Sequence, residues 1–72
     1  MDMTVYYEKL AENMRIERAR KKISQQRLAI LSNLSLDTIS NIECEKGNPT
    51  LETLISIALA LNVDLNTLLP LK

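Results

Sequence analysis

The stretch SQQRLAILSNLSLDTISNIE, residues 24–43, decides the fold of this 72-residue chain. Ser24 and Ser35 each stand directly before a set of apolar residues at helical spacing, where a helix N-cap is expected. Asn33 separates the two sets, whose members are Leu28, Ala29, Leu31, Ile39 and Ile42. Two helices of about two turns each, joined by a short break, form the helix-turn-helix pattern.

This spacing predicts helices over residues 25–32 and 36–43. The first buries Leu28 and Ala29, together with either Leu31 or Ser32. Asn33 follows at the position where a left-handed residue ends a helix, and its short side chain tolerates positive φ. The second helix turns Ile39 and Ile42 inward, so its outward positions are Leu36, Asp37, Ser40 and Asn41.

Length and composition indicate one small domain with an aliphatic core. Apolar residues make up 46% of the chain, but its only aromatic residues are two tyrosines. The chain contains one cysteine and no histidine. A disulfide within the chain is therefore impossible, a His/Cys metal site is not expected, and nucleophilic triads that need histidine are excluded. No enzyme activity, cofactor or small-molecule ligand is predicted.

Charge is balanced overall but is unevenly distributed. Nine basic and nine acidic residues give a net charge of zero. The first 34 residues carry seven basic and four acidic side chains, and the remaining 38 carry two and five. The basic cluster over residues 15–22 has two interpretations: its last members suit the negative end of a helix dipole, or they contact phosphate.

The flanking segments complete an all-helical prediction. Residues 1–5 are expected to form a short arm, with Thr4 as a cap for a helix over about residues 6–22. Thr50 caps a helix over about residues 51–61, whose expected inward face is Leu51, Leu54, Ile55, Ala58 and Leu61. Asp64 caps a last helix over about residues 65–69. No apolar run reaches a membrane span, and no signal pattern opens the chain, so a cytoplasmic location is expected.

Several separate motifs resemble one known family. They are Ser24-Gln25 before Leu28-Ala29, Ser35 with Thr38-Ile39-Ser40, Glu43 at a helix end, NPTLETL at 48–54 and ALALNV at 58–63. Over about residues 10–69 the chain resembles the lambda-repressor-like, Cro-type (XRE) helix-turn-helix DNA-binding proteins. The resemblance implies a compact five-helix domain whose 36–43 helix enters the major groove of double-stranded DNA.

The resemblance also implies site residues. Arg18 and Glu43 match a family ion pair, although two unrelated surface charges are the alternative. Asn41 matches a base-reading position and can bond to an adenine edge. Gln25 matches a glutamine that touches phosphate or braces a base-contacting side chain. The full set of expected DNA-binding residues is Gln25, Gln26, Ser35, Leu36, Asp37, Thr38, Ser40, Asn41, Lys46 and Asn48.

The predicted DNA face departs from the family pattern at several positions. Leu36 offers only an apolar contact, such as to a thymine methyl group. Asp37 can accept from cytosine N4 but repels phosphate, and its alternative role is favourable interaction with the helix dipole. Glu45 lies near the expected phosphate contacts, so a shallow salt dependence is expected. Cys44 is interpreted as a plain thiol, with a redox sensor as the alternative.

These features predict a transcriptional regulator of the restriction–modification controller type or the phage type. It is expected to act as a homodimer on a two-fold operator. The alternative is a protein–protein interaction module of the same fold. The whole chain is expected to be one domain, with residues 62–72 as the candidate dimerisation segment. The candidate dimer residues are Leu59, Val63, Leu65, Leu68, Leu69 and Leu71. The competing interpretation is that these residues complete the monomer core.

Overall fold

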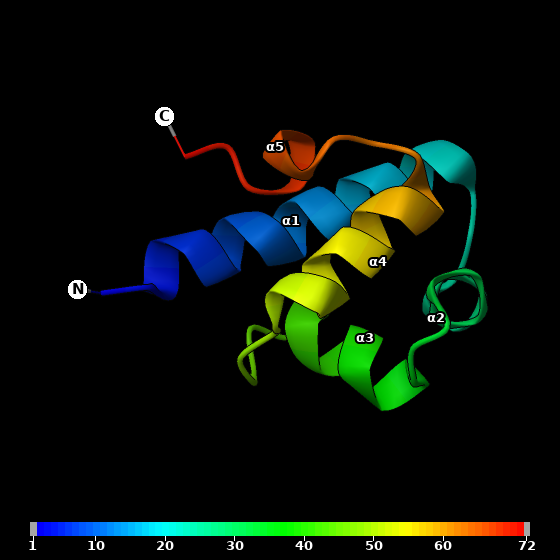
Figure 1. Ribbon diagram of the computed structural model, residues 1–72, viewed down its shortest axis with the longest axis horizontal. Coiled ribbons are helices and arrows are strands. Elements are labelled where there is room, and N and C mark those ends of the chain that lie inside the picture. The colour runs from blue at the N-terminus through cyan, green and yellow to red at the C-terminus, as the bar shows by residue number, and fades with distance from the viewer. Residues whose placement is uncertain (1, 72) are drawn as a thin grey trace.

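The computed structural model describes residues 2–71, which form five α-helices and no strand. The helices are α1 (Thr4–Lys21), α2 (Gln25–Ser32), α3 (Leu36–Glu43), α4 (Leu51–Leu61) and α5 (Leu65–Leu68). In Figure 1, α4 crosses in front of α1, α3 lies below them and α2 is seen nearly end-on. The predicted all-α, five-helix fold is confirmed.

The helix boundaries follow from local capping chemistry. The Oγ of Ser24 accepts from the Arg27 N–H at 2.9 Å, and that of Ser35 accepts from the Thr38 N–H at 3.0 Å. Each bond satisfies one of the main-chain donors that a helix start leaves free. Asn33 ends α2 with φ 58°, in the left-handed conformation that its sequence position predicted.

The start of α1 differs from the prediction. The helix begins at Thr4 with Met3 as its N-cap, so Thr4 and Val5 belong to the first turn and not to an arm. The Asp2 carboxylate accepts from the Thr4 N–H at 2.9 Å, which supplies a local acceptor two positions before the predicted cap. The expected arm is thus reduced to residues 2 and 3, and Met1 lies outside the described residues.

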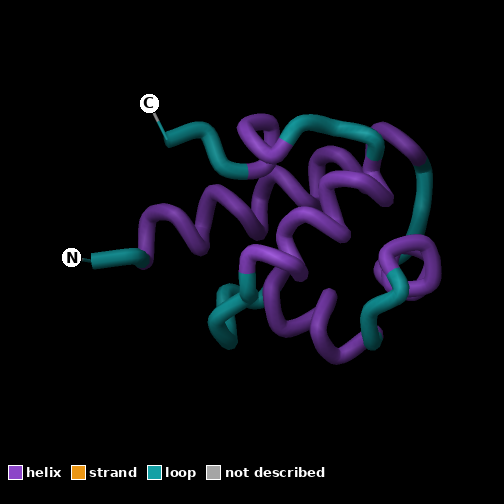
Figure 2. The backbone as a smooth tube through the Cα atoms, viewed as in Figure 1, coloured by secondary structure: helices purple, strands orange, loops and turns teal. Residues whose placement is uncertain are grey.

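The core is aliphatic, as the composition predicted. Its buried apolar side chains are Leu10, Ala11, Met14, Leu28, Ala29, Ile39, Ile42, Ile57, Ala58, Leu61 and Leu68. The long α1 packs against α3, α4 and α5, while α2 packs against α3 and α4 (Figure 2). Ser32, and not Leu31, takes the last inward position of α2, where its hydroxyl donates to the Leu28 carbonyl at 2.7 Å.

The inward face of α4 also differs from the prediction. Leu51 is 64% exposed and Ile55 is 44% exposed, whereas Ile57 is fully buried. This helix is apolar nearly all round, so hydrophobic spacing alone did not determine which side faces the core. Contact with α1, α2 and α5 sets the side, and α4 consequently carries exposed leucine and isoleucine side chains on its outer surface.

The short α5 packs against α1. Leu68 is fully buried, and the Asn13 amide donates to the Leu68 carbonyl at 2.9 Å. The hydrogen bond joins α1 to a residue 55 positions further along the chain. The docked α5 places the chain after α4 beside the middle of α1.

Candidate nucleic-acid interface

The α3 helix has one face in the core and one in solvent. Ile39, Ile42 and Glu43 are buried, while Leu36, Asp37 and Asn41 are exposed. Ser40, expected outward, is half-buried. The outer face therefore offers an apolar group, a carboxylate and an amide to a partner.

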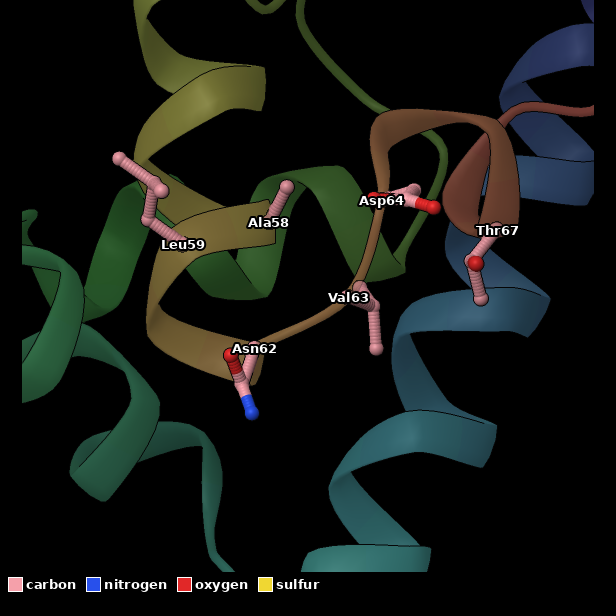
Figure 3. Close-up of a pocket in the computed structure, with 6 residues that line it drawn as sticks. All are labelled: Ala58, Leu59, Asn62, Val63, Asp64 and Thr67. Atoms are coloured by element: carbon pink, nitrogen blue, oxygen red, sulfur yellow. The ribbon is translucent and has the colours of Figure 1, made fainter.

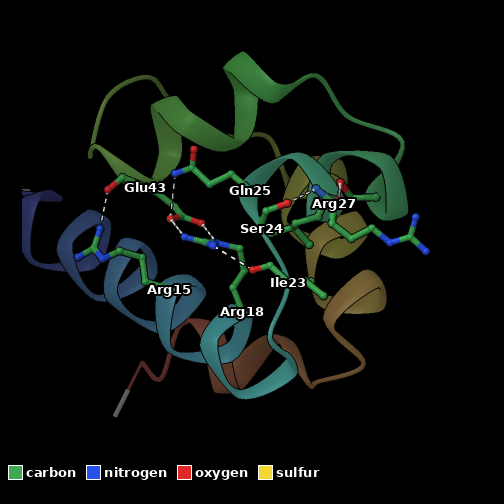
Figure 4. Close-up of polar contacts among 9 residues, drawn as sticks. Arg15, Arg18, Ile23, Ser24, Gln25, Arg27 and Glu43 are labelled. Atoms are coloured by element: carbon green, nitrogen blue, oxygen red, sulfur yellow. Dashed lines mark hydrogen bonds and ion pairs between the residues drawn. The ribbon is translucent and has the colours of Figure 1, made fainter.

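The predicted pair of Arg18 and Glu43 lies at the centre of a polar network that holds α3 (Figure 4). Arg18 Nε and Nη2 donate to the two carboxylate oxygens of Glu43, each at 2.6 Å. The Glu43 side chain is 2% exposed, so this bidentate pairing satisfies a carboxylate that water barely reaches. The hydrogen bond to Glu43 raises the pKa of Arg18, against the opposing effect of its partial burial.

Two further side chains hold the same end of α3. The Gln25 amide donates to Glu43 Oε1 at 3.1 Å, and Arg15 Nη1 donates to the main-chain carbonyl of Glu43 at 2.6 Å. Gln25 therefore contacts a buried carboxylate of the fold. Arg18 from α1 and Gln25 from α2 both donate to this carboxylate. Arg15 was missed as a positioning residue because the sequence placed it in a basic cluster. Its spacing of one helical turn from Arg18 could have identified it.

The basic cluster over residues 15–22 is divided between internal and exposed roles. Arg15 and Arg18 point into the network around Glu43. Arg20 pairs with Glu17 at 3.3 Å, although its own side chain is 71% exposed. The last turn of α1 carries Arg18, Arg20 and Lys21, an arrangement that suits the negative end of the helix dipole. The Arg27 side chain of α2 points away from the network in Figure 4.

The loop between α3 and α4 brings several of the expected DNA-binding residues together. An open cleft of about 220 Å³ lies between the loop and the neighbouring ends of both helices. Two residues of this loop have positive φ, Glu45 at 63° and Gly47 at 79°. Its lining residues are Thr38, Asn41, Ile42, Lys46, Gly47, Asn48, Pro49, Thr50 and Thr53.

The remaining candidates lie at the start of α3 and along α2. Gln26 and Leu36 line a second hollow, together with Ile30 and Leu34. The Ser35 hydroxyl is engaged as a helix cap and lies 2.8 Å from the Thr38 hydroxyl. One of these two hydroxyls donates to the other, which leaves one proton of the pair free for a partner.

The candidate dimer residues do not form one exposed set. Leu59 and Leu71 are 76% and 71% exposed, whereas Leu68 is fully buried. The prediction for Leu68 is therefore wrong, because the monomer core takes its side chain. Val63, Leu65 and Leu69 are half-buried. Figure 3 shows the hollow after α4, which Leu59 and Val63 help to line; Lys72 lies outside the described residues.

Two further features complete the description. Cys44 is an exposed free thiol at the end of α3. Among residues 2–71, no helix combines the length and apolar character that crossing a membrane requires. Within the same part of the chain, no cluster of three or more His, Cys, Asp or Glu side chains is arranged to hold a metal ion.

Comparison with known proteins identifies the family. A family model described as "Helix-turn-helix" matches residues 14–68. Control protein C.SmaI from Serratia marcescens is 44% identical over 60 residues, covering 83% of this chain and 71% of that protein.

Two solved structures share the architecture. The restriction-modification controller protein C.AhdI from Aeromonas hydrophila superposes with a TM-score of 0.82 at 29% identity, covering 86% of this chain and 94% of its own. The hypothetical transcription factor NHTF from Neisseria gives a TM-score of 0.88 at 33% identity, with coverages of 96% and 79%. The chain belongs to the lambda-repressor-like, Cro-type helix-turn-helix family of DNA-binding transcriptional regulators.

Proposed function

We propose that the protein is a cytoplasmic, homodimeric regulator of the controller type that binds a two-fold DNA operator. The observation that carries this proposal is the difference between the buried side and the exposed side of α3. The core and the Glu43 network hold one side, while Asn41 and its neighbours are left exposed on the other. A rigid helix with free side chains is what readout in the major groove requires. The controller proteins among its relatives support the same role.

Base readout is assigned to three positions of α3. The Asn41 amide can donate to and accept from an adenine edge, and Leu36 can pack on a thymine methyl group. Asp37 can accept from the amino group of cytosine. None of these side chains makes a hydrogen bond inside the described part of the protein, so binding DNA breaks no bond of the fold.

Phosphate contact is assigned to the cleft between α3 and α4. Lys46 supplies a cation there, and Asn48 and Thr38 supply neutral donors. The carboxylates of Asp37 and Glu45 lie on exposed positions of the same region and oppose binding of a polyanion. We therefore expect DNA affinity to depend on salt less steeply than in strongly basic repressors.

Dimerisation follows from the size of the reading surface. One α3 helix contacts a single half-site, and paired half-sites about one helical turn apart supply the remaining specificity. Leu59 and Leu71 are the candidate contacts because both are large, apolar and exposed. A second copy that covers them would remove this apolar surface from water.

The alternative function is protein binding by the same fold. The exposed Leu36 and Ile30 line one hollow, and an apolar surface at that place also suits a protein partner. Zero net charge agrees with this alternative as well. Binding of DNA by the purified protein distinguishes the two functions.

Selection of bound duplexes from a random pool, with the full chain, tests the proposal. We expect a two-fold sequence whose half-sites are about 10 base pairs apart. A Leu59→Glu variant should bind this operator more weakly and sediment as a monomer. Val5→Glu is the matched control, since Val5 is also exposed but lies outside both the candidate dimer residues and the expected DNA-binding residues. The proposal fails if no duplex is bound even at low salt.

A further inference from the structure

A side-chain hydrogen bond joins Tyr7 of α1 to Asn48 of the loop between α3 and α4. The Tyr7 hydroxyl donates to Asn48 Oδ1 at 3.1 Å. The two residues are 41 positions apart in the sequence, so the bond links the first helix of the fold to the rim of the cleft beside α3. The proposed function uses Asn48 but assigns no role to Tyr7.

The tyrosine is placed to hold this loop. Tyr7 lines a small apolar pocket of about 130 Å³ in which Pro49 and Leu54 also take part. Within the described residues, the segment 47–49 makes no main-chain hydrogen bond. The bond from Tyr7 to Asn48 is therefore a polar attachment of this segment to α1, and Pro49 faces the same pocket as Tyr7.

The direction of the bond determines what Asn48 offers to a partner. A primary amide has one acceptor oxygen and one NH2 donor group. Because Oδ1 accepts from Tyr7, the NH2 group is left free on an exposed side chain. A phosphate oxygen needs donors, and the neighbouring Lys46 and Thr50 line the same cleft. The opposite orientation of the amide would direct its carbonyl oxygen toward the phosphate.

We propose that Tyr7 is a positioning residue for DNA binding: its hydroxyl holds the Asn48 amide with the NH2 group toward a backbone phosphate. This inference rests on the proposed function. Without the hydroxyl, the amide rotates freely and the 47–49 segment loses one of its attachments. DNA must then order both groups on binding, which weakens affinity without removing any direct contact.

Five variants of the full chain test the proposal by fluorescence anisotropy with the selected operator duplex at fixed salt. Tyr7→Phe removes only the hydroxyl and should weaken binding about three- to tenfold, the range of one net hydrogen bond. Tyr6→Phe is the matched control, because Tyr6 is also half-buried and lines the same pocket. It should change affinity by less than about twofold.

The double variant gives the decisive measurement. If Tyr7 acts through Asn48, then Tyr7→Phe has no further effect in an Asn48→Ala background. Asn48→Asp keeps an acceptor for Tyr7 but turns a negative charge toward the phosphate, and should weaken binding more than about tenfold. Urea unfolding of each variant separates these effects from loss of the fold.

Three results would overturn the role of Tyr7. They are equal effects of Tyr6→Phe and Tyr7→Phe, additive effects in the double variant, or wild-type affinity in Asn48→Asp. If the wild-type chain binds operator DNA and one of these results is found, only the inference about Tyr7 fails. If the wild-type chain binds no duplex, the proposed function fails and the inference fails with it.

Discussion

The two sides of α3 differ in how their polar groups are satisfied. On the inner side, the Glu43 carboxylate accepts three hydrogen bonds, two from Arg18 and one from Gln25. On the outer side, the exposed Asp37 and Asn41 side chains make no hydrogen bond with the described residues. One helix of eight residues thus combines a fully paired buried charge with unpaired exposed groups.

This difference separates the energetics of folding from those of recognition. An unpaired charge at the buried position of Glu43 would cost several kcal/mol, so its partners must be present in every folded molecule. The exposed groups already bond to water, and their replacement changes the free energy of unfolding little. Substitutions on the two sides should consequently affect different measurements.

The largest effect is expected from Glu43→Ala. This change leaves the partly buried Arg18 guanidinium without its carboxylate, and it should lower the free energy of unfolding by about 3–5 kcal/mol. Urea unfolding followed by circular dichroism measures the change. DNA binding should fall only to the extent that the folded population falls.

A milder substitution sharpens this test. Glu43→Gln keeps the side-chain shape and one acceptor oxygen, but it removes the charge and turns an NH2 group toward the donors of Arg18 or Gln25. Its loss of stability should be smaller than that of Glu43→Ala. A Glu43→Ala protein within about 1 kcal/mol of wild type would show that the network does not hold α3.

An intermediate effect is expected from Asn41→Ala on the opposite side. Loss of the amide should weaken operator binding about five- to 150-fold, the range of one good base contact. The free energy of unfolding should stay within about 1 kcal/mol of wild type, because the main-chain carbonyl of Asn41 still accepts from Lys46. Competition with operators substituted one base pair at a time should show relaxed preference at one position. Equal losses at every position would contradict a base contact.

The smallest effect is expected from Asp37→Asn. Removing this exposed carboxylate should strengthen binding to random duplex about two- to fivefold at low salt, because repulsion from phosphate is lost. The gain should shrink as salt screens the charge. Titrations at several salt concentrations measure it, and unchanged low-salt affinity would place Asp37 away from the DNA backbone.

Most of the fold could be predicted because local chemistry marks the helix ends. The N-caps Ser24, Ser35 and Thr50 and the left-handed Asn33 are short polar residues with few alternative roles, and the bounds of α2, α3 and α4 followed from them. The start of α1 was misplaced because its local acceptor is Asp2, outside the expected pattern.

Tertiary contacts explain the remaining errors. In α4 almost every residue is apolar, so spacing could not show that Ile57 is buried and Leu51 exposed. The burial of Leu68 depends on the docking of α5 against α1, which no local pattern encodes. The pairing of Arg18 with Glu43 came from family resemblance. For the bond from Arg15 to the end of α3, the spacing of one helical turn from Arg18 was the available sequence signal.

In the homodimer proposed above, the attachment of α5 to α1 would make the end of the chain respond to the concentration of the protein. A helix of four residues cannot persist alone, so α5 exists only while Leu68 is docked and Asn13 holds its carbonyl. Hydrogen exchange should therefore detect its opening at a lower free energy than that of global unfolding. If the proposed dimer covers Leu71 and its neighbours, a second copy would favour the docked form by mass action. The fraction of dimer and the fraction of molecules with α5 docked would then both increase with protein concentration.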